Sequence, residues 1–282
     1  MAKQRDTTYS VAIVKYGHRD TMRSHVYLHY DAYHQPDGPI GMDYFVWLVR
    51  NDTRTILIDT GYSALGGARR HRKTLIDPAC ALELLGVDPT SPIDILLTHA
   101  HYDHCGNLDR FPNATVTASR REIEFWASDR SRHVVFRHPT DEENIAYLGQ
   151  VAAEDRLNLI EGRVEFAPGI EIIPTGGHTP GQYMVRVDTG HGHVLLTSDA
   201  AHYYEEYERD MPFVLVVEPQ AMLDGLAAIR AFERSGDLVI PGHDPLVFER
   251  IPPLQHGPLA GNVAMIEWMP PTGTTPGVHN KE

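Results

Sequence analysis

The stretch Thr98-His99-Ala100-His101-Tyr102-Asp103-His104-Cys105-Gly106 decides how this chain folds and what it can bind. It brings three imidazoles and a carboxylate into six consecutive positions, directly after the mainly apolar run 93–97. A buried strand has no folding reason to end in four metal-binding side chains. Mixed imidazole and carboxylate ligands suit zinc, iron, manganese or cobalt, whereas a closed structural zinc site would use thiolates. The stretch therefore predicts a metal site at the end of a buried strand.

The composition is that of an acidic globular protein. Of its 282 residues, 42% are hydrophobic and 22% are charged, which is enough for a substantial core, and the formal net charge is -13. Because phosphate binding needs a basic stripe, this charge argues against a nucleic-acid partner. The only cysteines, Cys80 and Cys105, do not form a disulfide framework, and we interpret Cys105 as a packing residue.

The amino-terminal residues 1–6 are polar or charged for the most part, and no apolar stretch follows them. A secretory signal needs such a stretch, so we expect none. No apolar run elsewhere in the sequence approaches the length of a membrane span. We therefore expect no membrane partner and a cytoplasmic location.

Hydrophobic periodicity and turn residues predict alternating strands and helices. We expect strands at residues 9–16, 43–50, 55–59, 93–98, 115–118, 164–166, 170–174, 183–187, 194–198 and 238–240. We expect helices at residues 78–85, 120–128 and 219–232, while 129–154 is ambiguous. The polar segment 17–41 is too long for a simple connection, so we expect it to border a functional surface. We expect a single domain over 1–282, in which 1–42 form a strand and an extended loop and 270–282 a frayed tail.

Three further strand ends carry residues of the same chemical kind. His178 is the centre of a glycine-rich turn, Asp199 follows an apolar strand, and His243 follows another. A single histidine at a strand end is more often structural, but four such strand ends in one chain indicate a common site. The order of elements suggests two similar αβ halves, packed sheet to sheet, with the site along one edge.

The sequence resembles the metallo-β-lactamase superfamily over roughly residues 44–245. The resemblance rests on His-x-His-x-Asp-His at 99–104, Gly-His-Thr-Pro-Gly at 177–181, Ser-Asp-Ala at 198–200, Gly-His-Asp at 242–244 and Ile-Asp-Thr-Gly at 58–61. It implies an α+β fold, an αβ/βα four-layer sandwich of two mixed β-sheets flanked by helices.

The resemblance also implies a dinuclear metal site. The first metal would be held by His99, His101 and His178, the second by Asp103, His104 and His243, and Asp199 would bridge the two. Two divalent ions are expected, with Zn²⁺ as the first expectation and iron, manganese or cobalt accepted by the same ligands. For Asp59 two interpretations have equal support: it holds a ligand imidazole in the correct tautomer, or it caps a turn.

Within the superfamily the chain is most similar to the branch of N-acyl-homoserine lactonases and related lactone hydrolases. This implies attack of a metal-bridging hydroxide on the ring carbonyl of a small-molecule lactone or ester, Asp103 as proton shuttle, and a homodimer. These lactonases typically carry a tyrosine three residues after the bridging aspartate, where this chain has His202, followed by Tyr203 and Tyr204. Either His202 donates the same hydrogen bond to the substrate, or Tyr203 takes that position, or the substrate differs.

Other functions of the same fold remain open. They are hydrolysis of another ester, a thioester or a cyclic amide, a mononuclear-iron persulfide dioxygenase with one metal site empty, and a non-catalytic binding protein. A true β-lactamase usually lacks the bridging aspartate, so Asp199 counts against that activity. We expect the mouth of the site to be aromatic, formed by residues 25–34, Tyr203 and Tyr204. Tyr44, Phe45 and Trp47 are further candidates, but alternate residues of their strand must lie in the core, and the core is the favoured position for each of them.

Overall fold

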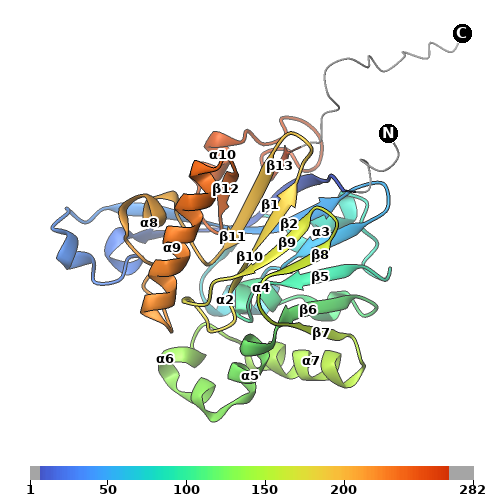
Figure 1. The fold of residues 1–282 in the computed structure, drawn as a ribbon, viewed down its shortest axis with the longest axis horizontal. Helices are drawn as coiled ribbons and strands as arrows, with labels where there is room; N and C mark the ends of the chain where they lie inside the picture. The colour runs from blue at the N-terminus through green and yellow to red at the C-terminus, as the bar shows by residue number, and fades with distance from the viewer. Residues whose placement is uncertain (1–6, 267–282) are drawn as a thin grey trace, which may run out of the picture.

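Two β-sheets lie face to face in the computed structural model, which describes residues 7–266 (Figure 1). The first sheet has the order β13-β1-β2-β3-β5-β6-β7, with β4 paired to β1. Its strands are β1 Ser10–Met22, β2 Pro39–Arg50, β3 Thr55–Ile58, β4 Lys73–Thr74, β5 Asp94–Leu97, β6 Thr115–Ser119, β7 Leu157–Ile160 and β13 Val263–Ile266. Strands β3, β5, β6 and β7 are parallel, so the residues that follow β3 and β5 meet at one edge of the sheet.

The second sheet has the order β12-β11-β10-β9-β8. Its strands are β8 Val164–Ala167, β9 Ile170–Pro174, β10 Tyr183–Asp188, β11 His193–Ser198 and β12 Leu238–Pro241. Strands β11 and β12 are parallel, whereas β10 pairs antiparallel with both β9 and β11. The residues that follow β11 and β12 therefore leave the second sheet at a common edge.

Strand β2 shows how the core is divided. Its side chains alternate, so that Phe45 and Trp47 pack between the two sheets while Tyr44 and its alternate neighbours face the helices on the other side. Both faces are buried, because the strand lies in the middle of its sheet and helices cover the outer face. Phe45 and Trp47 are therefore core residues, as favoured from the alternation along the strand, and the alternative that places them at the mouth is wrong.

Helices flank the two sheets (Figure 1). Near β6 and β7 lie α5 Arg120–Ala127, α6 Val134–Arg137 and α7 Glu142–Ala153; near β11 and β12 lie α8 Tyr204–Arg209, α9 Pro219–Arg234 and α10 Leu246–Arg250. The remaining helices are α2 Ala64–Arg69, α3 Pro78–Leu84 and α4 Tyr102–Cys105, with short 3₁₀ turns η1 Arg23–His25, η2 Tyr30–Tyr33, η3 Leu108–Arg110 and η4 Asp129–Arg132. The predicted fold class, two mixed sheets flanked by helices, is confirmed.

The largest departure from the predicted elements lies near the amino terminus. Strand β1 continues to Met22 and β2 begins at Pro39, so the irregular segment is 23–38 and not 17–41. The extra residues of β1 are mainly polar, and they pair with the start of β2, with Arg19 opposite Met42 and a bulge between Lys15 and Gly17. Backbone pairing extends this ribbon past its apolar part, which hydrophobic patterning cannot detect.

Several shorter elements were not expected, and the ambiguous segment 129–154 contains η4, α6 and α7. The unexpected elements are β4, β7, β13, α2, α4, α8, α10, η1, η2 and η3. No helix within residues 7–266 is both long and apolar enough to cross a membrane. The tail predicted for 270–282 lies outside the described residues, and a single domain over 1–282 stays a prediction.

Candidate metal centre

Four strand ends carry the predicted ligands to the same edge of the molecule. Asp59 directly follows β3, and Ser198 is the last residue of β11. Both adopt left-handed backbone conformations, with φ of 59° and 47°. Such conformations are costly for residues other than glycine and are frequent at functional sites, and here they turn the chain sharply as it leaves each strand. His178 follows Gly177, where a Cβ atom would lie 2.6 Å from the Cα of Met222. Only glycine lets this turn pack against α9.

All seven predicted metal ligands are buried and lie together. Ligand atoms within 4.8 Å of one another define three groups: His99, His101, His178 and Asp199; Asp103, His104 and His243; and Asp199, His202 and His243. Asp199 belongs to two groups, and its carboxylate lies 3.2 Å from His178 Nε2 and 3.3 Å from His104 Nε2. The geometry suits a carboxylate shared between two cations, and the assignment of each ligand to a cation stays a prediction.

The second ring nitrogen of three histidines is held by an oxygen outside the cluster. Nδ1 of His104 donates to Asp59 over 2.7 Å, and Nδ1 of His178 and of His243 donate over 2.7 Å to the carbonyls of Leu215 and Asp43. These bonds fix the tautomer, so that each Nε2 turns a lone pair inward. For Asp59 both interpretations hold, because its carboxylate also accepts from the backbone N–H and the hydroxyl of Thr98.

The inward-facing nitrogens fit a metal ion. Nε2 of His99 and Nε2 of His178 lie 3.1 Å and 2.9 Å from Nδ1 of His101. One proton on His101 can serve only one of these neighbours, so lone pairs converge without enough donors. Nε2 of His104 is buried and has no hydrogen-bond partner among residues 7–266. A divalent cation would satisfy such nitrogens.

Electrostatics in the cluster follow from burial and from the carboxylates. Burial, reinforced by neighbouring imidazoles, lowers the pKa of His99 and of His101 well below the ordinary value. Burial also opposes charge on His104, but the carboxylates of Asp199, Asp59 and Asp103 outweigh it and raise its pKa. The carboxylates therefore favour positive charge at the position where a cation would lie.

Glu122 is a residue of the site that the sequence did not reveal. Its buried carboxylate accepts hydrogen bonds from the backbone N–H groups of Ala100 and Gly181, from the Thr179 hydroxyl and from the Trp126 indole. It thereby joins the loop of His99 and His101 to the turn of His178. The sequence Ser-Arg-Arg-Glu at 119–122 resembles a capping box, which gives Glu122 an ordinary helical role, but no side-chain cap hydrogen bond forms.

His202 lies inside the cluster. Its fully buried ring stacks on Phe213 at a centroid distance of 3.6 Å, with Nε2 at 3.0 Å from Asp199 and Nδ1 at 3.3 Å from Glu206. Burial lowers its pKa, but the two carboxylates prevail and raise it to about 9. His202 therefore brings a polar group to the position where the lactonases typically carry a tyrosine.

The two tyrosines after His202 point elsewhere. The Tyr203 hydroxyl donates to the carbonyl of Gly41 over 3.1 Å, so a contact with substrate would require this bond to break. The Tyr204 hydroxyl donates to the carbonyl of Val239, within the core of the second sheet. The prediction that Tyr204 lies at the mouth is therefore wrong, because α8 turns this side chain toward β12.

The irregular segment 23–38 reaches the site through Tyr27, which pairs with Phe213. Val26 accepts a backbone hydrogen bond from Val214, and Tyr27 forms a bridge with Phe213, the residue that stacks on His202. The segment is fastened to α8 because Glu205 accepts from Arg23 and from the Tyr27 hydroxyl. Residues 23–38 therefore support one wall of the site.

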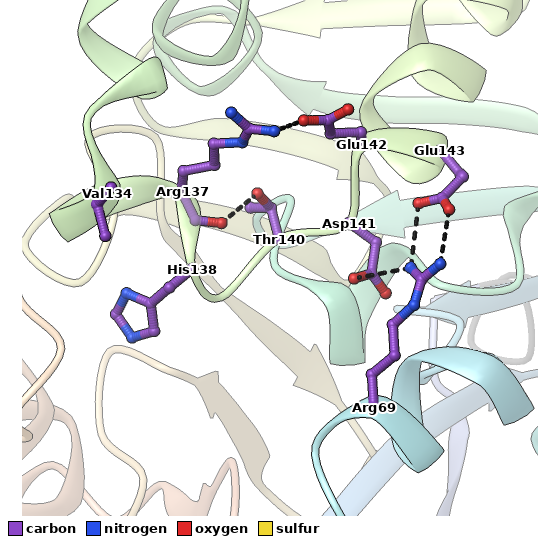
Figure 2. A pocket seen from close by; sticks show the side chains of 8 residues that line it. All are labelled: Arg69, Val134, Arg137, His138, Thr140, Asp141, Glu142 and Glu143. Carbon is purple, nitrogen blue, oxygen red and sulfur yellow. Dashed lines mark hydrogen bonds and ion pairs between the residues drawn. The ribbon is translucent and has the colours of Figure 1, made fainter.

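A hollow of about 600 Å³ lies apart from the cluster, beside α6 and α7 (Figure 2). Arg69 reaches toward Asp141 and Glu143 on one side of it, and Arg137 pairs with Glu142 on the other. Its charged groups are thus engaged with one another, and none of the predicted site residues lines it.

Known proteins support a family assignment. The profile of the metallo-beta-lactamase superfamily matches residues 41–247, a span that includes all seven predicted ligands. The chain belongs to the metallo-beta-lactamase superfamily. An N-acyl homoserine lactonase from Bacillus sp is 28% identical over 225 residues, which cover 73% of this chain and 81% of that protein. The N-acyl homoserine lactonase AiiA from Bacillus thuringiensis subsp. kurstaki is 25% identical, with 74% and 84% covered.

Solved structures of known proteins share the fold. A quorum-quenching N-acyl homoserine lactone hydrolase superposes with a TM-score of 0.72 at 22% identity, covering 87% of this chain and 96% of that one. A dizinc quorum-quenching lactonase in complex with a product superposes with a TM-score of 0.66 at 17% identity, covering 95% and 96%. The predicted class, a metal-dependent hydrolase with the metallo-beta-lactamase fold, is confirmed.

Proposed function

We propose that this protein is a dinuclear metal-dependent hydrolase that opens a lactone, an N-acyl homoserine lactone or a related cyclic ester. The observation that carries the proposal is the convergence of seven buried imidazoles and carboxylates from four strand ends, with Asp199 shared between groups. The names of the curated relatives, N-acyl homoserine lactonases at 25% to 28% identity, support the choice of a lactone.

The seven predicted ligands form two groups, one for each cation. His99, His101 and His178 would hold one cation, Asp103, His104 and His243 the other, with Asp199 between them. Two bound Zn²⁺ ions would polarise the ester carbonyl and lower the pKa of a water molecule. Asp59 and the carbonyls of Leu215 and Asp43 keep the ligand rings oriented, which is the usual function of such outer partners.

Asp103 is the proton carrier in this proposal. Of the seven ligands it is the most exposed, at 8%, so its carboxylate borders both the cluster and the solvent-facing side. It takes a proton from the attacking water and delivers that proton to the alkoxide oxygen that leaves when the ring opens. Both steps need a carboxylate oxygen, which an amide cannot replace.

His202 is the proposed partner of the substrate carbonyl. The ring stacks on Phe213 and lies between two carboxylates, and its buried Nε2 has no hydrogen-bond partner among residues 7–266. From there Nε2–H donates to the carbonyl oxygen as negative charge develops on it, which is the task of a preorganised donor. Tyr203 is the alternative donor, and it is less favoured because its hydroxyl is engaged by Gly41.

One alternative function of the fold, the dioxygenase, is distinguished by the second group of ligands. A mononuclear-iron dioxygenase needs only the first group, whereas here Asp103, His104 and His243 are complete and buried, which favours two cations. Hydrolysis of another ester, a thioester or a cyclic amide uses the same residues and differs only in the substrate. A homodimer and a cytoplasmic location stay predictions.

The test is proton release by the zinc-loaded protein. Substrates are short- and long-chain N-acyl homoserine lactones, simple γ- and δ-lactones, aromatic-fused lactones, and a thioester and a cyclic amide for comparison. We expect acid release from at least one lactone class and a loss of about 10²- to 10⁴-fold in Asp103→Asn. Asp109→Asn, an exposed aspartate close by in the chain, should behave as the wild type.

Release from the thioester or the cyclic amide alone, with two zinc ions per chain, would keep the hydrolase and reject the lactone. Full activity of Asp103→Asn would reject the proton carrier.

A further inference from the structure

Two arginines without a carboxylate partner lie beside the cluster. Among residues 7–266, neither Arg19 nor Arg72 forms an ion pair within 4.0 Å, although both are partly buried. The Nε atom of Arg19 is buried and has no hydrogen-bond partner. Buried guanidinium groups are normally paired, so two unpaired ones near a candidate active site need an explanation.

The strand register directs Arg19 toward the cluster. Arg19 lies opposite Met42, and Gly17 lies opposite Tyr44, in the antiparallel pair of β1 and β2. Directly paired residues, and residues two apart along a strand, share a face of the sheet. Arg19 is therefore on the face of Tyr44, whose ring meets the ring of the ligand His243 at a centroid distance of 5.1 Å.

Arg72 approaches the same tyrosine from another direction. Its guanidinium carbon lies 5.8 Å from the centre of the Tyr44 ring. Its Nε donates to the Tyr102 hydroxyl over 2.9 Å and its Nη1 to the carbonyl of Arg70 over 2.8 Å. No hydrogen bond of its Nη2 occurs within residues 7–266, and the Tyr102 hydroxyl interacts with the hydroxyl of Tyr44.

Both arginines act on the hydroxyl of Tyr44. Burial raises the pKa of Tyr44, and the positive charges of Arg72 and Arg19 oppose that rise. Asp103 is the one carboxylate among the main groups that shift the pKa of Arg72, which it raises. It is also a predicted metal ligand. A cation bound by Asp103 would neutralise it, which would leave Arg72 without this counter-charge.

We propose that Arg19 and Arg72, with the hydroxyls of Tyr44 and Tyr102, form a subsite for an oxyanion group on the substrate. This group, a carboxylate or a phosphate, is separate from the ester that is hydrolysed and lies on the side of Asp103 and His243. The inference rests on the proposed function and names its substrate class as acidic lactones or esters. Guanidinium and phenol donors are well suited to such groups.

The first test compares matched substrates. A lactone with a carboxylate side chain and its neutral carboxamide are hydrolysed by the wild type, Arg19→Met and Arg54→Met, an exposed arginine in the turn between β2 and β3. We expect the wild type to favour the acid by about tenfold or more in kcat/KM, through KM, and Arg19→Met to lose that preference. Arg54→Met should retain it.

Arg19→Met removes no hydrogen bond found within residues 7–266, so a folding defect is not expected. Arg72→Gln serves as a second variant, with circular dichroism to confirm its fold. An unchanged acid-to-amide ratio in both variants would overturn the subsite, whereas hydrolysis of neither substrate would count against the proposed function alone.

The second test needs no turnover. Binding of glutarate and of its monoamide to zinc-loaded protein is measured by calorimetry in the same variants. We expect glutarate to bind the wild type about tenfold more tightly than the monoamide, and the two to bind Arg19→Met equally. 3-Phosphonopropionate in place of glutarate decides between a phosphate and a carboxylate. Equal binding of all three ligands to the wild type would overturn the proposal.

Discussion

His202 differs from the seven predicted ligands because its ring stacks on Phe213, at a centroid distance of 3.6 Å. Its two ring nitrogens also face the carboxylates of Asp199 and Glu206. This supports its proposed role as a fixed donor, and it makes the residue testable by substitutions that keep the shape of the ring.

We predict that His202→Phe lowers kcat/KM for the best lactone by about 10²-fold, chiefly through kcat, because it removes a donor aimed at the developing charge. His202→Gln retains an N–H group and should recover part of the loss. Zinc content is measured in parallel, and His193→Phe, at the far end of β11, is the control. A kcat/KM within twofold of wild type in zinc-loaded His202→Phe would exclude His202 and favour Tyr203.

For individual residues, the sequence predicted the metal ligands but not the groups that hold these ligands in place by hydrogen bonds. Histidines and aspartates after apolar strands are unusual enough to be noticed, and all seven lie together. Glu122 and the carbonyl of Leu215 could not be predicted, because a glutamate in a helix and a backbone oxygen have no distinctive pattern. Their importance arises only when distant loops meet, as when Glu122 contacts both Ala100 and Gly181.

Among the secondary-structure elements, helix α5 holds two loops of the site in place, because its Glu122 accepts hydrogen bonds from both of them. We predict that Glu122→Gln lowers the free energy of unfolding by about 2–4 kcal/mol, since the amide group would direct N–H toward other donors in a buried position. Denaturant unfolding measures this, and zinc affinity should fall as well. Glu124→Gln makes the same change on an exposed face of α5.

If Glu122→Gln were as stable as Glu124→Gln and bound zinc as tightly, the loops would not depend on the carboxylate. The buried network would then be a consequence of the fold and not a cause of the ligand geometry.

The elements that were predicted well are those whose side chains are buried in a regular pattern. Strands β2, β9, β10 and β11 alternate or are continuously apolar, and their bounds agree with the sequence to within a few residues. Strand β13 and the polar end of β1 were missed, because they are stabilised by pairing with β1 and β2 at distant positions in the chain. Short helices such as α10 depend on the same long-range context.

At the scale of the whole molecule, the two parallel strand pairs explain why one edge carries the chemistry. Strands β3 and β5 end beside Asp59 and His99, and strands β11 and β12 end beside Asp199 and His243. Packing the two sheets face to face brings these ends together, and the ligands are completed by both halves. A site of this kind requires the whole fold, so metal binding and folding should be coupled.

The measurement that tests the two-cation hydrolase most directly is a zinc titration of metal-free protein while the opening of its best lactone is followed. Two complete groups of ligands predict that activity rises until two zinc ions are bound per chain and then stays constant. Activity that is complete at one ion per chain, with no second ion bound, would contradict the dinuclear site. In that case His99, His101 and His178 would carry the chemistry with a single metal.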